Sequence, residues 1–222
     1  MGKKDNILGL TENSGNDVIK EKAFKIISDL RWVGFSTIGI NGKKPENRIF
    51  SIDSWDDGNL YFGTAPGKPV YEELMKNPNV AITLTTKDWL MVKISAEVAR
   101  VYDEKQISKF WDMNPGIKIL YEKAPDRFKI FCFKKGEGEL FDLGPTNIMR
   151  LRFGFGGVEP RPIRYSINDE CDSCGECVEV CTVEAIISED QNVIDPKHCL
   201  ECGACYDVCP VNAIQKSDSA NA

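Results

Sequence analysis

The sequence lacks the features that would place the chain in a membrane, on the secretory route or on a His-ligated metal. No run approaches the roughly 20 apolar residues of a membrane span, and residues 1–17 show no apolar core followed by a cleavage site. His198 is the single histidine, which disfavours a His-ligated haem or a three-His zinc site. We therefore expect a cytoplasmic protein with no membrane partner, whose nine cysteines stay reduced instead of forming a disulfide framework.

Cysteine and charge are both unevenly distributed along the chain. Eight of the nine cysteines fall between residues 171 and 209, and only Cys132 stands apart. From Arg161 onward there are 12 acidic residues and 4 Lys or Arg, a net charge of −8, whereas the preceding residues carry 22 acids and 24 Lys or Arg. This contrast predicts two domains and argues against nucleic acid as a partner.

The last part of the chain is an internal duplication with an offset of 28 residues. The segment CDSCGECVEVCTVEAI from Cys171 aligns with CLECGACYDVCPVNAI from Cys199, and all four cysteines coincide. Each copy reads C-x2-C-x2-C-x3-C, the spacing of bacterial ferredoxins in which the fourth cysteine ligates the other cluster. Residues 165–216 therefore resemble a small α+β ferredoxin domain that holds two [4Fe–4S] clusters.

The spacing assigns three cysteines of one copy and the last cysteine of the other copy to each cluster. One cluster is then held by Cys171, Cys174, Cys177 and Cys209, and the second by Cys199, Cys202, Cys205 and Cys181. Thr182 stands where the other copy has Pro210, and threonine can take the same backbone shape. The alternative is structural zinc, whose paired cysteines flank a longer finger and fit two overlapping triplets badly. We interpret His198 as a surface histidine, with cluster tuning as the alternative.

Alternating apolar residues predict a mainly β body before the duplication. A helix is expected over residues 17–30, with Asp17 as its N-cap, and another roughly over 104–121. Asn41-Gly42 and Asp57-Gly58 are hairpin-type turns between β-prone runs. Roughly six or seven antiparallel strands with short helices favour a barrel closed on itself.

Two runs show the clearest strand pattern, residues 79–85 and 90–101, in which apolar residues alternate with small or polar ones. Cys132 shares a strand face with Phe128 and Ile130, and we interpret it as a buried structural thiol.

A tight turn before a helix is a possible anion site. A strand ending at Thr64 is followed by Pro66-Gly67, Lys68 and Pro69, and proline suits the first position of a helix. Helix N-terminal amides, a lysine and a hydroxyl favour a bound phosphate, although a capped surface helix would look the same. A Walker A loop is excluded because three residues, not four, separate Gly63 from Gly67-Lys68.

The order of these motifs resembles the FMN-binding split barrels related to pyridoxamine 5′-phosphate oxidase, in particular the nitroimidazole-reductase-like subgroup. A helix leads to PENRIFSI, then to DDGNLYFGT, GKPVYEELMKNPNV and DWLMVKISAEVARV. The resemblance spans roughly residues 17–143 and implies an FMN site in a homodimer, with F420 as an alternative cofactor. The residues that it implies for cofactor binding are Arg48, Ile49, Phe50, Ser51, Thr64, Lys68 and Trp89.

The resemblance also implies roles for these residues. Arg48 and Lys68 would neutralise the phosphate, Thr64 would add a hydroxyl donor, and backbone near Phe50 would meet the polar edge of the flavin. Trp89 would line the pocket or else belong to the barrel wall. Ile49 stands where the subgroup often has proline, which leaves the role of the neighbouring arginine open.

These observations predict a flavin–iron–sulfur reductase that receives electrons from a donor protein or a small reductant and passes them to a small-molecule substrate. The alternative is a non-enzymatic electron-transfer or redox-sensing module. Oxygen-sensitive clusters suggest an anaerobe. The arginines of the connector either belong to a plain linker, dock the acidic domain or receive an anionic substrate. The expected divisions are an N-terminal tail (1–16), the split barrel (17–145), a connector (146–164), the ferredoxin domain (165–216) and a C-terminal tail (217–222).

Overall fold

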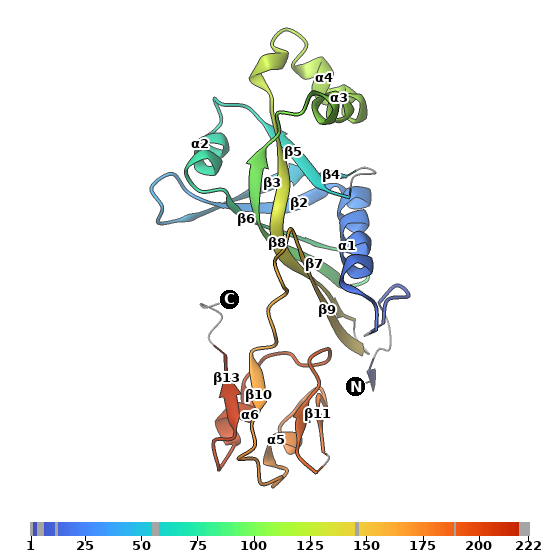
Figure 1. Cartoon of the computed structure of the whole chain (residues 1–222), viewed down its shortest axis with the longest axis vertical. Helices are drawn as coiled ribbons and strands as arrows, with labels where there is room; N and C mark the ends of the chain where they lie inside the picture. The colour runs from blue at the N-terminus through green and yellow to red at the C-terminus, as the bar shows by residue number, and fades with distance from the viewer. Residues whose placement is uncertain are drawn as a thin grey trace.

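The computed structural model describes residues 2–3, 7–11, 13–54, 58–144, 147–188 and 190–217. The chain is elongated, with a strand-rich body above a smaller unit, which we call the cysteine module (residues 165–217) (Figure 1). Asp57 of the expected turn and residues 218–222 of the expected tail lie outside the described residues.

The helices and strands of the body follow one another along the chain in a mainly β order. They are β1 (Gly2–Lys3), α1 (Asn16–Leu30), β2 (Trp32–Ile38), β3 (Pro45–Ser51), β4 (Asp53–Ser54), β5 (Leu60–Thr64), α2 (Pro69–Lys76), β6 (Asn79–Thr85), β7 (Leu90–Arg100), α3 (Glu104–Met113), α4 (Pro115–Leu120), the 3-10 turn η1 (Pro125–Arg127), β8 (Lys129–Leu143) and β9 (Asn147–Phe155). The module has β10 (Tyr165–Ile167), α5 (Glu176–Glu179), β11 (Ile186–Ile187), β12 (Val193–Ile194), α6 (Ala204–Val208) and β13 (Ile214–Lys216).

Within the described residues, the body forms one curled nine-stranded sheet in the order β1-β9-β8-β7-β6-β2-β3, with β5 joined to β8 and β4. All its neighbours pair antiparallel except β1 and β9. The first half of β8 pairs with β5 and its second half with β9, so this one strand runs the length of the body. The mainly β fold is confirmed, but the expected barrel of six or seven strands closed on itself is wrong, because the described strands form a curled sheet that ends at β1 and β3.

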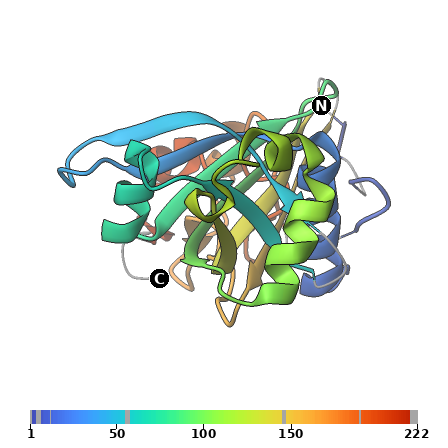
Figure 2. The same cartoon turned by 90° about the horizontal axis from the view of Figure 1, so that it is seen from above.

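The inside of the curl is filled by apolar side chains and by one face of α1. Ile19, Ala23, Phe24 and Ile27 of that helix are buried because they recur at helical spacing. Figure 2, seen from the end away from the module, shows α2 and α3 on opposite sides of the sheet. No helix in the described part of the chain is long and apolar enough to cross a membrane.

Several local expectations are confirmed and others need correction. Gly42 takes a positive φ of 70° in the β2–β3 turn, and Cys132 is buried. The N-cap of α1 is Gly15, so the expectation for Asp17 is wrong; Asp17 lies in the first turn. The helix expected over 104–121 breaks in two at Asn114 because Pro115 begins α4.

A hydrogen-bonded cluster of Asn114, Asp53 and Arg31 holds the break between the two helices in place. Asn114 Nδ2 donates to Asp53 Oδ2 at 3.0 Å, and the other carboxylate oxygen of Asp53 accepts from Arg31 at 2.7 Å. Burial raises the pKa of Asp53, while the hydrogen bond from Asn114 and the charge of Arg31 oppose that rise. This cluster fixes where α4 leaves the end of α3.

The duplication in the sequence is repeated in the backbone of the module. Left-handed residues recur at the same offset of 28, in the pairs Ser173 and Glu201, Gly175 and Gly203, and Glu184 and Asn212. Each glycine caps a short helix, α5 or α6, with φ near +87°. The Thr182 copy therefore keeps the backbone turns of the Pro210 copy.

The segment expected as a connector begins with a strand. Residues 147–155 form β9, which pairs with β8 over residues 136–143, so the sheet continues past the expected boundary at residue 145. The remaining connector is residues 156–164, before β10.

Candidate functional site

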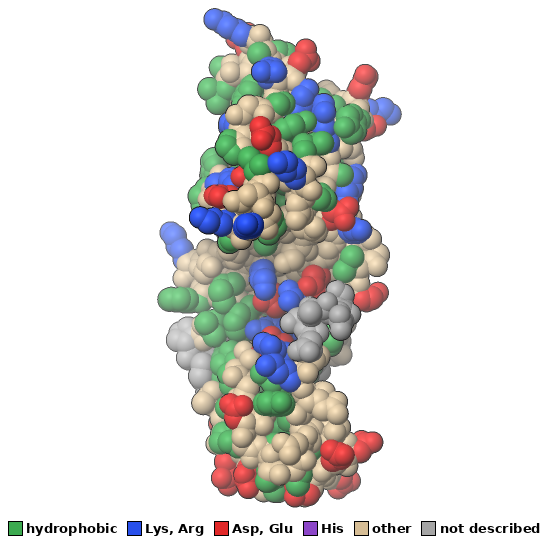
Figure 3. Space-filling model, turned by 90° about the vertical axis from the view of Figure 1, so that its left-hand side faces the viewer, with side chains coloured by type: hydrophobic (Ala, Val, Ile, Leu, Met, Phe, Trp, Pro, Cys, Tyr) green, Lys and Arg blue, Asp and Glu red, His purple; other side chains and the backbone are tan. Residues whose placement is uncertain are grey.

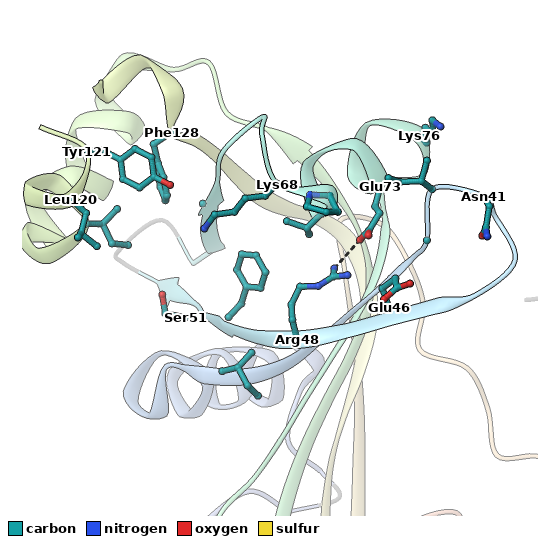
Figure 4. A pocket seen from close by; sticks show the side chains of 18 residues that line it. Asn41, Glu46, Arg48, Ser51, Lys68, Glu73, Lys76, Leu120, Tyr121 and Phe128 are labelled. Atoms are coloured by element: carbon teal, nitrogen blue, oxygen red, sulfur yellow. Dashed lines mark ion pairs between the residues drawn. The ribbon is translucent and has the colours of Figure 1, made fainter. Parts of the chain in front are cut away.

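A cleft of about 1150 Å³ opens between β3, α2 and α4, and Figure 4 shows side chains that line it. Helices α2 and α4 lie at the end of the body far from the module (Figure 1). One wall is apolar, with Phe50, Leu120 and Phe128. The other side carries charge, from Arg48, Lys68, Glu73 and Lys76. A large cleft with an apolar wall and a few charged groups is typical of a small-molecule site.

Lys68 reaches the cleft because of the turn between β5 and α2. Pro69 occupies the first helical position of α2, which leaves Lys68 as an N-cap with extended backbone. Its side chain projects among the lining residues in Figure 4. At the end of β5, Gly63 lies under an aromatic ring, since a Cβ on it would come within 2.0 Å of Phe128 Cε1.

Arg48 is paired inside the chain. Its Nη1 lies 2.9 Å from Oε2 of Glu73 and donates to the hydroxyl of Thr37 at 2.7 Å (Figure 4). Thr37 in turn donates to the same Glu73 oxygen at 2.5 Å. Both Thr37 and Glu73 are buried, so the arginine charge is largely matched before any ligand binds.

The residues predicted for cofactor binding are not all in one place. Five of the seven line the cleft: Arg48, Ile49, Phe50, Ser51 and Lys68. Thr64 is buried beside Gly63, and its hydroxyl has no hydrogen-bond partner among the described residues. Trp89 lies in the β6–β7 turn with φ of 64° and is exposed. Its backbone oxygen accepts from Leu143 at the far end of β8, away from the cleft of its own chain.

Sequence reasoning missed Glu73 as part of this site. The signal was present, because Glu73 falls on the same face of α2 as the buried Val70 and Leu74. An acid on the apolar face of a short helix calls for a cationic partner, which is Arg48. The sequence around Phe128 does not indicate that this residue lines the cleft, because the fold of α4 and η1 places it there.

In the module, the four cysteines assigned to the first cluster line one small cavity: Cys171, Cys174, Cys177 and Cys209. Asn192 borders the same cavity, and its side-chain amide donates to the sulfur of Cys177 at 3.5 Å. No three Cys, His, Asp or Glu side chains in the described ranges converge closely enough to hold a single metal ion. The donor set of four thiols around a cavity fits a [4Fe–4S] cluster.

The remaining four cysteines form a second group. Cys181 is close enough to Cys199 to raise the pKa of its thiol. Cys199 and Cys202 are likewise close enough to Cys205 to raise the pKa of that thiol. Burial raises the pKa of Cys205 to about 11, and the nearby Cys199 thiol adds to that rise. Cys177 and Cys209 of the first group pack in the same apolar core as Cys181, Cys199 and Cys205, so the two groups are neighbours. Metal ligation requires these thiols to lose their protons.

The fourth cysteine of each copy is held by the same contact. Ala185 N–H donates to the sulfur of Cys181 at 3.2 Å, and Ala213 N–H to the sulfur of Cys209 at 3.3 Å. Hydrogen bonds to cluster sulfurs are among the factors that set reduction potential.

His198 is not the surface histidine that the sequence suggested. It is 8% exposed, and its Nδ1 lies 2.5 Å from Oδ2 of Asp195. Residues 195–199 form a helix-like turn in which Cys199 N–H donates to the Asp195 carbonyl, and this turn keeps His198 beside Asp195.

The module is attached to β9 by buried charges. Arg150 Nη1 lies 2.7 Å from one oxygen of Glu201, and Arg152 Nη2 lies 2.9 Å from the other. Burial alone would raise the pKa of Glu201, but hydrogen bonds from Arg152 and from the backbone N–H of Arg164 hold this pKa below its ordinary value. Two of the connector arginines thus dock the acidic module, and Arg161 pairs with Glu137 of the body.

Comparison with known proteins supports both halves of this description. A family model described as a 4Fe-4S binding domain matches residues 165–187 and 192–215, one match for each copy of the duplication. The module is therefore a ferredoxin-type iron–sulfur segment. No curated protein matches the chain.

The body has the fold of known split barrels. A NimC/NimA family protein from Clostridium acetobutylicum is 20% identical, with a TM-score of 0.55, and the match covers 63% of this chain and 94% of that chain. PhzG from Burkholderia lata 383, solved with tetrahydrophenazine-1-carboxylic acid, is 14% identical with a TM-score of 0.51, covering 68% and 92%. At these identities the likeness establishes the fold. The predicted split barrel joined to a ferredoxin segment is confirmed.

Proposed function

We propose that the chain is a flavin–iron–sulfur oxidoreductase. FMN would occupy the cleft, two [4Fe–4S] clusters would occupy the module, and electrons from the clusters would reach FMN and then a small-molecule substrate. The observation that carries the proposal is the joining of two ferredoxin-type repeats to a split barrel with a large cleft. The proposal includes a homodimer and a cytoplasmic location.

The residues of the cleft fit FMN. Phe50 and Phe128 offer apolar surface for the ring, and Lys68 offers a cation for the phosphate. The unpartnered hydroxyl of Thr64 is a further donor close to the same turn. Because Glu73 already matches Arg48, Lys68 is the main phosphate cation in this proposal. Bound flavin supplies the conversion between single electrons and electron pairs.

The size of the cleft favours an enzyme over a relay. Sites for single small ligands have volumes of about 300–1000 Å³. The cleft of about 1150 Å³ leaves room beside a flavin, along the wall that Tyr121 forms. Phe110 and Trp111 do not add to this room, because both pack against Phe128. The region around Phe110 and Trp111 is therefore filled by side chains and offers no space for a substrate. It is the one observation in favour of the second candidate, an electron-transfer or redox-sensing module with FMN as relay.

Anaerobic purification tests the proposal directly. We expect flavin and about eight irons per chain, as two four-iron clusters require, and the extracted flavin to be FMN and not F420. Reduced protein should then be reoxidised by a member of a panel of small acceptors, such as quinones and nitroaromatics. Zinc in place of iron, or no flavin, would sink the proposal. Iron and flavin with no reactive acceptor would favour the relay.

A further inference from the structure

The cleft and the cysteine module lie at opposite ends of one chain (Figure 1). Strand β8 gives the scale of the separation. Phe128, just before it, lines the cleft, whereas Phe141, near its end, packs against the apolar core of the module. Thirteen residues of strand at about 3.3 Å each span roughly 40 Å, somewhat less in a straight line where the strand bends. Electron transfer through protein falls off exponentially with distance, so this separation is too long for direct exchange.

The module is not free to swing toward its own cleft. Arg150, which is 8% exposed, pairs with Glu201, and its backbone N–H donates to the Lys197 carbonyl at 2.8 Å. Ile148 of β9 is buried within the core of the module itself. Breaking these contacts would leave buried charges without partners, which is costly.

We propose that the cysteine module of one chain serves the cleft of a second copy of this chain. This inference rests on the proposed function of cleft and module. In a two-fold dimer, a contact between one surface of the first chain and another surface of the second chain is repeated with the chains exchanged. A pairing that sets the module end of one chain against the cleft end of its partner shortens both electron paths at once.

Exposed apolar side chains at the two ends support a second copy as the occupant. Ile49 and Leu120, at the cleft, are 65% and 81% exposed. Trp89, at the module end of β8, is 61% exposed although it is a large aromatic side chain. Burying these three residues against one another would remove apolar surface that a single chain leaves in water.

The charges of the two ends are also complementary. On the face in Figure 3, Asp and Glu side chains gather around the base of the module, whereas over the body Lys and Arg side chains are interspersed with Asp and Glu. The segment from Arg161 onward carries a net charge of −8. Lys76 also lines the cleft and is not assigned to the flavin phosphate, so its charge remains available to an acidic partner surface. Opposite charges on two surfaces favour their association.

The electron balance needs one external reductant. A low-potential ferredoxin gives single electrons to the clusters of one chain and is oxidised. Two such electrons, with two protons from water, reduce one FMN in the cleft of the partner chain to its dihydro form.

Crosslinking between isotopically distinct chains tests the geometry without any cofactor. A photo-crosslinking residue replaces Leu120, and natural-abundance chains are mixed with 15N-labelled chains. We expect crosslinks to peptides of residues 165–217 in which one peptide is labelled and the other is not. The same crosslinker in place of Lys25, on the exposed face of α1, should capture none of these peptides. Crosslinks within single chains only, or a monomer by sedimentation, would overturn the proposal.

Mixed pairs test the electron path. One chain carries C171S and C199S, keeping its flavin but losing its clusters; the other carries K68E, keeping its clusters but losing its flavin. Two different affinity tags isolate the mixed pair. With reduced ferredoxin, its flavin should bleach within about threefold of the wild-type rate, and at least 100-fold faster than in pure cluster-deficient pairs.

A mixed pair as slow as the pure cluster-deficient pair would overturn the inference while leaving the proposed function intact. Wild-type protein that binds no flavin, or whose flavin never bleaches, would instead refute the proposed function. The crosslinks still decide in that case whether the two ends meet.

Discussion

Arg48 and Glu73 form an ion pair at the edge of the cleft, with 2.9 Å between Arg48 Nη1 and Glu73 Oε2. The carboxylate is 3% exposed and also accepts from Thr37. Removing the cation from such a pair leaves an uncompensated buried charge, whereas removing a cation that has no partner does not. The two cations of the cleft, Arg48 and Lys68, should therefore respond differently to truncation.

Arg48→Ala should destabilise the fold by about 3 kcal/mol, because Glu73 loses its partner. Lys68→Ala should change stability by less than about 0.5 kcal/mol, because no ion pair joins Lys68 to any described residue. It should nevertheless weaken FMN binding about tenfold, the loss of a charge-assisted hydrogen bond. Urea unfolding and flavin fluorescence titration measure the two effects. Equal destabilisation by both variants would contradict this division of roles.

Gly63→Ala should disturb the wall of the cleft. The added Cβ would lie 2.0 Å from the Phe128 ring, which has to move, and overpacking of this kind costs about 1–3 kcal/mol. Gly67→Ala, four residues along, is the matched control, because its Cβ would meet nothing within 4 Å. Thermal melts of both variants, with and without FMN, check this. A Gly63 variant as stable as the control would show that Phe128 yields freely.

Much of this architecture follows from local sequence patterns. Strands β6 and β7 could be predicted because their alternation of apolar and polar residues matches the period of a strand with one buried face. Likewise, the start of α2 follows from Pro69, since proline favours the first helical position. The spacing of the cysteines predicted both ligand groups, one of which lines a common cavity.

The misplaced features depend on contacts between distant residues. Trp89 was expected to line the pocket or the barrel wall, and the register of β7 with β8 sets it beside Leu143, away from the cleft of its own chain; no local pattern encodes that register. His198 was interpreted as a surface histidine, yet the fold turns its ring inward against Asp195. Residues 147–155 were expected to begin a connector, but they pair with β8 as strand β9, and Arg150 of this strand is covered by the module.

Glu201→Gln should loosen the attachment of the module to the body. The neutral amide cannot match the charges of Arg150 and Arg152, so we expect the contact to weaken by about 1–3 kcal/mol. Residues 156–164 should then be cleaved at least about tenfold faster in limited proteolysis of the cluster-loaded protein. Glu179→Gln is the control, an exposed acid on α5 with no ion pair to the described residues. Unchanged cleavage, with iron content retained, would argue that Ile148 and its apolar neighbours hold the module alone.

Cys209→Ser should remove the cluster of the other copy, not the cluster of its own. Cys209 lines the cavity of Cys171, Cys174 and Cys177 and approaches it from the second repeat. We therefore expect iron to fall from about eight to about four per chain, because two four-iron clusters are reduced to one. Electron paramagnetic resonance of the reduced protein should lose the features of two interacting clusters and show one isolated centre. Cys132→Ala, which removes a buried thiol of the body, should leave the iron content unchanged.

To identify which cluster is lost, Cys209→Ser can be combined with Cys171→Ser, which targets the same cluster, or with Cys199→Ser, which targets the other. The first double variant should retain about four irons and the second almost none. The reverse pattern would show that each repeat ligates its own cluster.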